Sequence, residues 1–512
     1  MKNLVVCCDG TWNTPDQSEH GVPSPTNVVR LFNCVTDRAA DGVPQEKYYH
    51  PGVGTGSNWW DKLAGGGTGI GLSRNVMSAY KWLAERYEPG DRIYLFGFSR
   101  GAYTVRSAAG MLASKTCGLL KLDGLDDPTI WARVERAYQR GYRERKDRSA
   151  WAGDWEFHEV APGDFRIPVH FLGVWDTVGA LGIPDELAIL NLLDDTRRYA
   201  FHDTKLNDRV RHGCHAVALD ERRLSFAPTL WTGIEHRPEI KQVWFPGVHS
   251  DVGGGYLETG LSDGALEWMM DEAAAQQLGL HPQMRQQVRP DPQGVLHDSR
   301  MGLYKAMRAQ PRNWPELDRR NCPALLHRSV FSRLDNPPIT QAPYHRSLRL
   351  APGEERVFPI YAGEPWNETG LFLGADEEYE FTATGEWMDR DIKCGPTGTR
   401  DGKFQAAEIA HLAGSLWGKV EGAFKKLTAN AQADFRGTKR VEDLPWFALV
   451  GFIANGGEDD EGRPILPEII PIRDGINRTI RRPGYLYCFA NDAWNFYDNN
   501  RGSVRLTVRR IR

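Results

Sequence analysis

The amino-acid sequence predicts an α/β-hydrolase fold, in which helices flank a mostly parallel sheet, followed by a C-terminal antiparallel β-sandwich. Three observations lead to this prediction. Short apolar runs alternate with helical stretches in the first part of the chain, one of those runs ends at a serine between two glycines, and later segments alternate like half-buried strands. We therefore expect a catalytic domain at 1–343 and a sandwich domain at 344–512.

Five apolar runs in the first domain are expected to be buried strands, because each is short, nearly continuous in apolar character, and ends at or near Gly or Asp. These runs are 2–10, 47–54, 92–98, 169–176 and 240–248. Helical stretches separate or follow them, at 73–87, 102–114, 127–146 and 263–279. This alternation of strand and helix is typical of a doubly wound sheet.

Two segments of the first domain depart from the simple alternation. Residues 123–165 are helical and charged, and they separate two strands by more than a crossover needs, which predicts an inserted helical cap. Residues 280–343 are rich in Pro and Arg, and we interpret them as the end of the domain plus a linker.

The second domain is predicted from segments that alternate, or that carry β-branched and aromatic residues, between Gly and Asn turns. These segments are 355–363, 378–387, 446–454, 484–492 and 502–511. A helical insert at 403–436 interrupts them. Its apolar residues recur at helical spacing, which favours core packing over docking to a membrane.

Composition argues against several classes of protein. The 512 residues carry a formal net charge of −4, so no basic excess is present for binding nucleic acid. No apolar run approaches the roughly 20 residues of a membrane-spanning helix, and the first apolar run is too short for a signal peptide. We therefore expect a cytoplasmic location in the producing cell, although export by a route that needs no signal peptide would leave the same sequence. The eight cysteines contain no CxxC pair and are expected to be reduced core thiols.

Residues 97–101 read Gly-Phe-Ser-Arg-Gly and match the G-x-S-x-G pattern of a nucleophile elbow. A chain of this length contains such a match by chance about one time in five, so the context decides. The motif follows an apolar run and opens a helical stretch, as an elbow requires. We predict Ser99 as a nucleophile, with an oxyanion hole formed by the N–H of Arg100 and a second N–H from Gly10 or Thr11. The alternative is an ordinary Gly-rich turn.

A serine nucleophile needs a histidine as base and an acid that orients the histidine. Asp176 ends one apolar run, and His249 follows another beside a Gly-rich turn. The chain order Ser99, Asp176, His249 is the order expected for this fold. His50 is the rival base but precedes the serine, and His170 lies inside a predicted strand and is expected to be a core residue.

Asp9 and Asp251 are predicted to support the site. Asp9 follows the first apolar run, and the simplest role for its carboxylate is to brace the loop by accepting backbone N–H groups. A competing interpretation is that Asp9, Asp176 and Asp251 ligate a divalent metal. The chain would then be a carboxylate-cluster metallohydrolase, and Ser99 would have no chemical role.

Four motifs, CDGTWN, GFSRGAYTVR, VWDTVGALG and HSDVGGGY, together resemble a bacterial family of α/β-hydrolases with a GFSRGA elbow. That family includes phospholipase effectors of type VI secretion systems. The motifs cover roughly residues 1–340 in one order. The resemblance implies a serine esterase of the lipase type, with Ser99, Asp176 and His249 in the roles given above. It also implies a lipid or other ester substrate, and a secretion carrier or an immunity protein as partner.

The segments GEWMDRDIKCGPTG and GYLYCFANDAWNFYDNNRGSVRLTV resemble small calcium-dependent galactose-binding lectins of the bacterial PA-I type. The resemblance implies a Ca²⁺ site formed by Asp492, Asn499 and Asn500, with backbone carbonyls of Phe496 and Asp389. Side-chain and carbonyl oxygens suit this hard cation. The helical insert and extra loops depart from the family, and a metal-free sandwich used only for docking is the alternative.

The sequence thus predicts a serine carboxylic-ester hydrolase of the phospholipase type, which needs no cofactor for catalysis. Its C-terminal domain is expected to bind a glycan or a membrane surface and to hold Ca²⁺. One alternative is a calcium-dependent glycan-binding or scaffold protein whose hydrolase domain is inactive, and the other is the metallohydrolase described above. Only the serine hydrolase contains an activated serine, so reaction with a fluorophosphonate distinguishes it from both.

Overall fold

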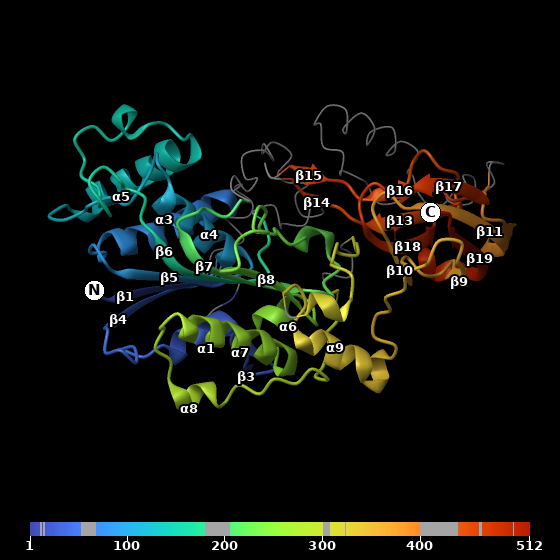
Figure 1. Cartoon of the computed structure of the whole chain (residues 1–512), viewed down its shortest axis with the longest axis horizontal. Helices are drawn as coiled ribbons and strands as arrows, with labels where there is room; N and C mark the ends of the chain where they lie inside the picture. The colour runs from blue at the N-terminus through green and yellow to red at the C-terminus, as the bar shows by residue number, and fades with distance from the viewer. Residues whose placement is uncertain are drawn as a thin grey trace. The chain divides into compact units, whose positions relative to one another are not determined.

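The computed structural model describes residues 1–10, 13, 16–52, 68–179, 205–300, 308–322, 324–399, 439–459, 463–494 and 496–512 (Figure 1). The chain forms two compact units. Unit 1 comprises Met1–Gln310, Arg319–Ala342 and Glu458–Pro464, and unit 2 comprises Pro311–Asp318, Pro343–Gly457 and Ile465–Arg512. The helical insert predicted at 403–436 lies outside the described residues.

Unit 1 is built on a six-stranded sheet in which every neighbouring pair of strands is parallel. The strand order is β4-β1-β5-β6-β7-β8. The strands are β1 (Asn3–Cys8), β4 (Gln45–His50), β5 (Arg92–Phe98), β6 (Val169–Trp175), β7 (Val210–Ala218) and β8 (Ile240–Phe245). The predicted α/β-hydrolase fold is confirmed, and β7 is a strand that the apolar runs did not indicate.

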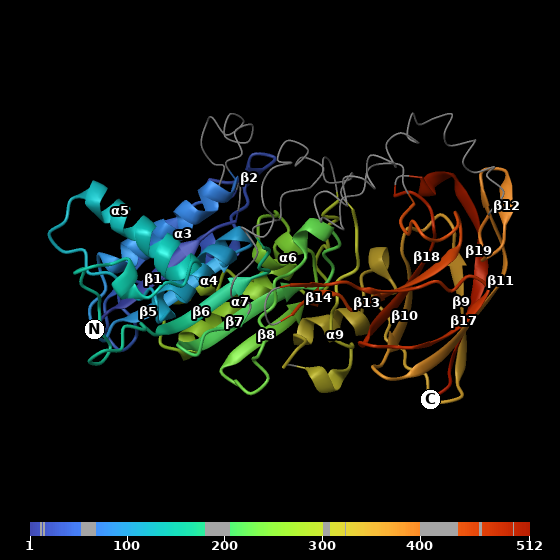
Figure 2. The ribbon, with the colours of Figure 1, turned by 90° about the horizontal axis from the view of Figure 1, so that it is seen from above.

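Helices cover both faces of this sheet (Figures 1 and 2). The helices α3 (Thr68–Ala84) and α4 (Arg100–Ala113) pack on one face, and α1 (Asn27–Cys34) and α7 (Gly260–Ala275) pack on the other. Consecutive side chains of β5 therefore enter different cores, Leu95 on the first face and Phe96 on the second. Because both faces are buried, the strands need apolar residues at nearly every position, which explains their continuous apolar runs.

The strand order of the sheet reverses at β1, which has β4 on one side and β5 on the other. In open α/β sheets, ligands bind outside the carboxyl ends of the strands at such a reversal. The residues that follow Cys8 in β1 and Phe98 in β5 therefore lie where this topology places a ligand site.

The segment predicted as a cap is helical in the structure. It contains α5 (Asp127–Arg136), a π-helical turn (Ala137–Arg143) and a short 3₁₀ segment (Arg148–Ala150). The Asp126 side chain caps α5 by accepting the Thr129 N–H at 3.1 Å. The segment packs against α3 and α4, where Tyr138 Oη lies 3.1 Å from Ser73 Oγ.

Several short elements complete unit 1: β2 (Ser18–Glu19), β3 (Val22–Pro23), α6 (His249–Gly253), α8 (Pro282–Arg285), α9 (Arg328–Asp335) and 3₁₀ segments at Leu224–Phe226, Arg319–Asn321 and Ile339–Gln341. Residues 280–342, interpreted from the sequence as the end of the first domain plus a linker, contain α8 and α9 of unit 1. The buried Arg333 of α9 donates to the Pro292 and Gly294 carbonyls at 2.6 and 2.9 Å, which ties α9 back to the preceding loop.

Two further properties of the described residues concern membrane-spanning helices and the state of the cysteines. The helices in the described ranges include none that is long and apolar enough to cross a membrane. The eight cysteines are free thiols, and six of them are buried, including the adjacent pair Cys7 and Cys8 in β1.

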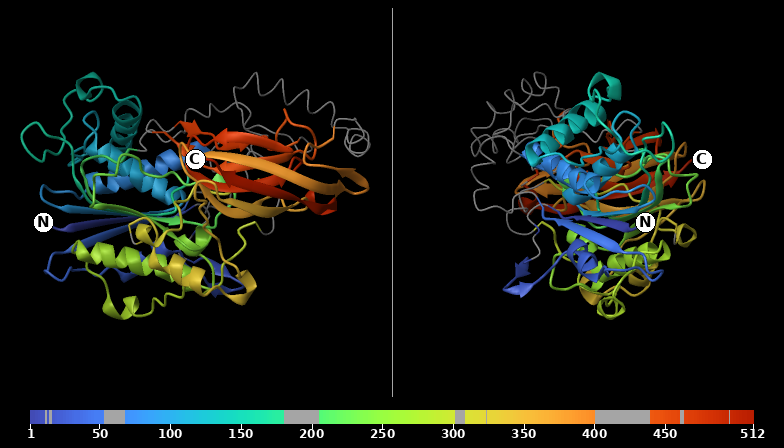
Figure 3. Two further views of the ribbon diagram at one scale, coloured as in Figure 1. Left: turned by 45° about the vertical axis from the view of Figure 1, so that its right-hand side comes forward. Right: turned by 90° about the vertical axis from the view of Figure 1, so that its left-hand side faces the viewer.

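Unit 2 is a sandwich of two antiparallel sheets (Figure 3). One sheet has the order β10-β18-β13-β16, and the other has the order β12-β11-β19-β9 with β17 paired to β11. The strands are β9 (Glu355–Tyr361), β10 (Asn367–Leu373), β11 (Glu378–Asp389), β12 (Ile392–Cys394), β13 (Leu449–Ala454), β16 (Glu468–Ile470), β17 (Gly475–Thr479), β18 (Gly484–Ala490) and β19 (Asn500–Arg510). This arrangement confirms the predicted β-sandwich.

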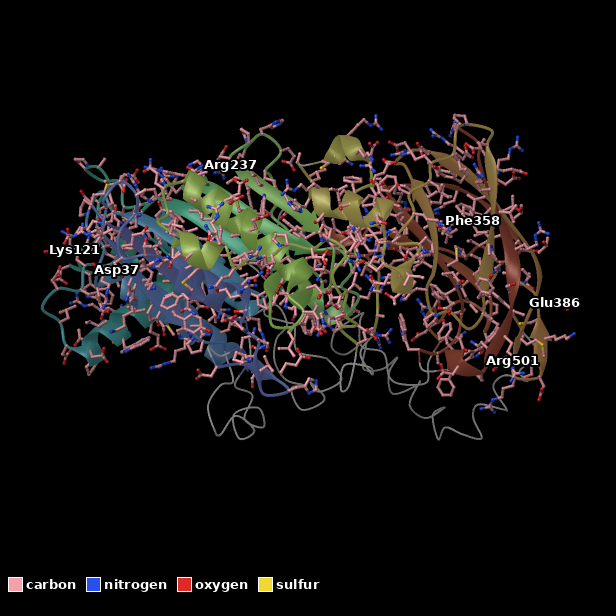
Figure 4. All side chains as sticks on the ribbon, turned by 90° about the horizontal axis from the view of Figure 1, so that it is seen from below. Asp37, Lys121, Arg237, Phe358, Glu386 and Arg501 are labelled. Carbon is pink, nitrogen blue, oxygen red and sulfur yellow. The ribbon has the colours of Figure 1, made fainter. Side chains whose placement is uncertain are left out.

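The five-stranded sheet has one buried and one exposed face. In β11, Phe381 and Trp387 are buried in the core between the sheets, whereas Thr382 is exposed. Glu386 of β11 and Arg501 of β19 are also exposed (Figure 4). This two-residue alternation is the pattern that identified the domain in the sequence.

The turn from β5 into α4 brings backbone atoms unusually close together. A Cβ atom added to Gly101 would lie 2.0 Å from the Cys8 carbonyl oxygen in β1. A Cβ atom on Gly97 would lie 2.5 Å from the Gly101 carbonyl oxygen. Both positions therefore require glycine, because a methyl group there would push β1 and α4 away from the turn.

We expect the substitution Gly101→Ala to destabilise unit 1 by at least about 2 kcal/mol, because the added methyl group overlaps a backbone carbonyl that cannot rotate away. The matched control is Gly264→Ala in α7, where an added Cβ meets no atom within 4 Å and alanine favours the helix. Denaturant unfolding measures both variants. Equal stabilities of the two variants would contradict the described turn.

Candidate active site

Ser99 lies in a strained backbone conformation between β5 and α4. Its φ and ψ angles are 57° and −121°, a region that residues with a side chain rarely adopt. The Ser99 N–H donates to the Trp175 carbonyl at 3.1 Å, which fixes the turn against the end of β6. Such strain costs on the order of 1–3 kcal/mol and is concentrated at functional sites. The predicted sequence of strand, sharp turn and helix is therefore present.

Asp176 and His249 form a buried hydrogen-bonded pair. Asp176 follows β6 and His249 begins α6, just after β8. His249 Nδ1 donates to Asp176 Oδ2 at 2.6 Å, and the Ala218 N–H donates to Asp176 Oδ1 at 2.9 Å. Because the carboxylate accepts from Nδ1, the pair fixes the tautomer in which Nε2 of His249 is the basic nitrogen.

Burial lowers the pKa of His249 below its ordinary value, and the bond to Asp176 opposes this shift. The histidine is therefore uncharged at neutral pH. An uncharged imidazole with a basic Nε2 is the form that can accept a proton from a hydroxyl group.

The Ser99 turn and the His249 ring are neighbours. The ring of Phe98, the residue before Ser99, has its centroid 4.6 Å from that of the His249 ring. No hydrogen bond joins the Ser99 hydroxyl to His249 among the described residues. Catalytic hydrogen bonds are often long without substrate and shorten in the substrate complex.

The three backbone groups predicted for the oxyanion hole have different surroundings. Arg100 begins α4 directly after the Ser99 turn. The Gly10 N–H lies close to the turn but donates to Asp9 Oδ1 at 2.7 Å, so this donor is already engaged. Thr11 lies outside the described residues. Of the predicted donors, the Arg100 N–H is the one at the start of the helix that directly follows Ser99.

Asp9 accepts hydrogen bonds from three segments of unit 1. Its Oδ1 accepts the Gly10 N–H, and its Oδ2 accepts the Thr26 hydroxyl at 2.6 Å and the Tyr49 hydroxyl at 2.9 Å. Burial raises the pKa of Asp9 to about 6, although these bonds oppose the shift. The carboxylate thus links the loop after β1 to the start of α1 and the end of β4. Two of these three donors are side-chain hydroxyls, whereas the sequence analysis expected backbone N–H groups.

Asp251 supports the helix that carries His249. Its carboxylate is fully buried and accepts the Val248 N–H at 3.0 Å and His297 Nδ1 at 2.6 Å. Asp9, Asp176 and Asp251 therefore each have their own N–H or O–H donors. The described residues contain no group of three or more His, Cys, Asp or Glu side chains arranged to hold a metal. This geometry gives the metallohydrolase alternative no support.

Glu221 is a site residue that the sequence analysis missed. It is 1% exposed and follows β7, the strand that was not predicted. Glu221 Oε2 accepts the His249 N–H at 3.3 Å and Arg223 Nη2 at 2.8 Å, and Oε1 accepts the Ser299 hydroxyl at 2.9 Å. Had β7 been recognised in the sequence, an acidic residue just after this strand would have indicated Glu221 as a site residue.

His215 also supports the site without having been predicted. Its Nε2 accepts the Thr177 N–H at 3.2 Å, so the loop after Asp176 is held from β7. Of the two other histidines considered from the sequence, His50 ends β4 at the same edge of the sheet, where its carbonyl accepts the Asp9 N–H at 3.0 Å and its Nδ1 contacts the Pro51 carbonyl at 2.7 Å. His170 packs against Tyr94 in β5.

Unit 2 brings together the residues predicted to bind calcium. Asn500 Nδ2 donates to Asp492 Oδ2 at 2.8 Å, and Asn499 Nδ2 donates to Asp389 Oδ1 at 2.5 Å. The Oδ1 atoms of Asn499 and Asn500 are buried and have no hydrogen-bond partner among the residues that the structure describes. Burial raises the pKa of Asp492 to about 7. Phe496 lies in the same loop, just before Asn499.

Comparison with known proteins finds similarity over the first half of the chain. A family model described as the catalytic domain of Tle1-like phospholipase effectors of the type VI secretion system matches residues 2–272. The uncharacterized protein YEL023C of Saccharomyces cerevisiae is 31% identical over 256 residues, which cover 47% of this chain and 34% of that protein. The chain thus spans about a third of the length of this relative.

Solved structures show weaker similarity. An uncharacterized protein from Pseudomonas aeruginosa is 21% identical with a TM-score of 0.33, covering 57% of this chain and 49% of that chain. A Tle1 effector bound to the VgrG spike is 20% identical with a TM-score of 0.28, covering 50% and 51%. The PllA-like lectin domain of EclA is 16% identical with a TM-score of 0.19, covering 30% and 94%.

The raised pKa of Asp9 predicts how the free energy of unfolding depends on pH. A carboxyl group whose pKa is higher in the folded state holds its proton more tightly there, so stability is lost as the pH rises from about 4 to about 6. Replacing Asp9 by Asn removes this titration but keeps an acceptor for the Gly10 N–H. Relative to the wild type, Asp9→Asn should gain about 2.4 kcal/mol of unfolding free energy between pH 4 and pH 7.

Urea unfolding of the two proteins at both pH values measures this difference. Comparing the variant with the wild type cancels the contributions of the other carboxyl groups. A difference in unfolding free energy that stays constant between pH 4 and pH 7 would show that Asp9 does not carry a raised pKa.

Proposed function

Because the chain belongs to the family of Tle1-like phospholipase effectors of the type VI secretion system, we propose that it is a serine hydrolase acting on phospholipid-like carboxylic esters. One observation carries this proposal. A serine on a strained turn at the carboxyl edge of a parallel sheet lies beside a buried Asp–His pair, and the histidine ring contacts the residue before the serine. These are the residue types and the placement of a nucleophile elbow with its base and acid.

In the proposed mechanism, His249 Nε2 accepts the Ser99 hydroxyl proton as Oγ attacks the acyl carbonyl carbon. Asp176 holds Nδ1–H and stabilises the imidazolium that forms. The Arg100 N–H, with Thr11 as the proposed second donor, stabilises the oxyanion. His249 then gives the proton to the leaving alcohol and activates a water molecule, which releases the acid from the acyl enzyme.

The family also supports a proposal about delivery and partners. Tle1-like effectors are assigned to type VI secretion, so we expect a component of that apparatus to carry this chain out of the producing cell. The solved Tle1 effector is described as bound to a VgrG spike, which makes a spike protein the first candidate to test by co-purification. An immunity protein in the producing cell remains a prediction.

The substitution Ser99→Ala should abolish ester hydrolysis while the protein stays folded. Loss of the attacking oxygen lowers kcat by about 10⁴-fold or more in serine hydrolases. Turnover of short acyl esters and of phospholipid vesicles measures the effect. Ser107→Ala is the matched control, because Ser107 is a buried serine of α4, the helix that follows Ser99, and is not part of the proposed mechanism.

A fluorophosphonate that modifies the wild type and Ser107→Ala but not Ser99→Ala would support the assignment. A wild-type protein that does not react with the probe would favour the scaffold alternative. Turnover that survives in Ser99→Ala would also exclude Ser99 as the nucleophile.

We further propose that unit 2 binds Ca²⁺ through Asp492, Asn499 and Asn500, with Asp389 and the carbonyl of Phe496 contributing. Two buried amide oxygens that have no partner within the described ranges support this proposal, because such groups are rare unless an ion or water satisfies them. Burial, and to a smaller extent the nearby charge of Asp389, disfavours the ionised form of Asp492, and a divalent cation would stabilise that form. Bound Ca²⁺ would supply coordination for vicinal sugar hydroxyls.

If this site binds Ca²⁺, adding the ion at about 100 times its dissociation constant should stabilise unit 2 by about 2.7 kcal/mol. Thermal unfolding with CaCl₂ or with EDTA measures the shift. Asn500→Ala should remove it, whereas Asn477→Ala on the exposed side of β17 should keep it. An identical shift in both variants, or none in the wild type, would contradict the site. Ester turnover should be unaffected by EDTA.

A further inference from the structure

The His249 ring lies between two aromatic side chains from different parts of unit 1. The Phe98 ring centroid is 4.6 Å from that of His249 at an interplanar angle of 33°, and the Phe226 ring centroid is 5.0 Å away at 77°. We propose that Phe98 and Phe226 are positioning residues that hold the imidazole of the catalytic base in its working orientation. This inference rests on the proposed function and deepens it. We refer to these two residues as the aromatic clamp.

The first side of the clamp is fixed by tight packing. Phe98 is 2% exposed, and its ring lies so close to Gly253 that a Cβ atom added there would be 2.0 Å from the ring. Gly253 ends α6, the helix that begins with His249. The Phe98 ring therefore fills the space between the backbone of α6 and the imidazole, which explains a glycine at position 253.

Phe98 also couples the two reacting groups. It is the last residue of β5 and directly precedes Ser99. A displacement of its ring would move either the Ser99 turn or the His249 ring. The buried Phe98 side chain thus sets the distance between Ser99 and His249. This distance matters because a misplacement of about 1 Å can lower the reaction rate about 100-fold.

The second side of the clamp, Phe226, is linked to α6 through the ion pair of Arg223 and Glu221. The Arg223 guanidinium lies 3.5 Å from the Phe226 ring centroid, and Arg223 Nη2 donates to Glu221 Oε2 at 2.8 Å. Glu221 Oε2 in turn accepts the His249 N–H at 3.3 Å. Phe226, Arg223, Glu221 and the His249 backbone therefore form a continuous chain of contacts.

The clamp has two consequences for the base. Two rings of fixed position leave the imidazole little freedom to tilt, so Nε2 keeps one direction relative to Ser99. Both rings also exclude water from the imidazole, and burial lowers the pKa of His249. Loosening the clamp admits water, which raises the pKa of His249 toward its ordinary value.

The test compares Phe98→Leu and Phe226→Leu with Phe96→Leu. Phe96 is a matched control, because it is a fully buried phenylalanine in the same strand that contacts Phe171 and Trp175. Steady-state hydrolysis of a short acyl ester gives kcat and KM across pH. The clamp variants should lose about 10- to 100-fold in kcat, with KM changed less than about twofold. Phe96→Leu should lose less than about threefold in kcat.

The pH profile separates positioning from a general loss of stability. In Phe98→Leu and Phe226→Leu, the acid limb of kcat/KM should move to higher pH, because His249 then gains a proton more readily. NMR titration of the His249 ring, assigned with His249→Gln, measures the same shift without turnover. Phe96→Leu should leave the acid limb of kcat/KM and the pKa of His249 unchanged. Phe226→Tyr, which keeps the ring, should show the wild-type values of both quantities.

Two results would overturn the inference. One is a folded Phe98→Leu or Phe226→Leu with wild-type kcat and an unshifted His249 pKa. The other is an equal loss of kcat in Phe96→Leu without any pH shift in the clamp variants. If Phe98→Leu does not fold, the half-buried Phe226 decides the test alone. An inactive wild type that does not react with a fluorophosphonate would instead refute the proposed function itself.

Discussion

The backbone turn at Ser99 is the constraint on which the rest of the site depends. A serine at φ 57° is held there because β5, β6 and α4 fix both ends of the turn. Gly97 and Gly101 permit the close approach of strand and helix that this conformation needs. The packing of the sheet against α4 thus offsets the backbone strain, and the turn places the Ser99 hydroxyl at the carboxyl edge of the sheet.

Buried carboxylates connect the loops that surround this turn. Asp9 connects the loop after β1 to α1 and β4, Asp176 connects the end of β6 to His249, and Glu221 connects the end of β7 to the same histidine. Each carboxylate accepts several donors, which compensates its burial. The loops at the carboxyl edge are therefore placed by hydrogen bonds from neighbouring strands rather than by their own sequence.

Much of this arrangement follows from the sequence. Strands buried on both faces leave continuous apolar runs, and the carboxyl ends of parallel strands share one edge, so Ser99, Asp176 and His249 were expected together. β7 was missed because Arg211, His212 and His215 interrupt its apolar character. The contacts of Glu221 and Phe226 with His249 depend on residues far apart in the chain. No local pattern encodes such contacts.

The central claim is that Ser99 and His249 act as nucleophile and base in one site. A crystal structure of the protein after reaction with a fluorophosphonate tests this most directly. The account predicts a covalent bond from phosphorus to Ser99 Oγ, the phosphonyl oxygen at the Arg100 N–H, and His249 Nε2 within about 3.2 Å of Oγ. An adduct on another residue, or an imidazole well outside hydrogen-bond reach of Oγ in the adduct, would contradict it.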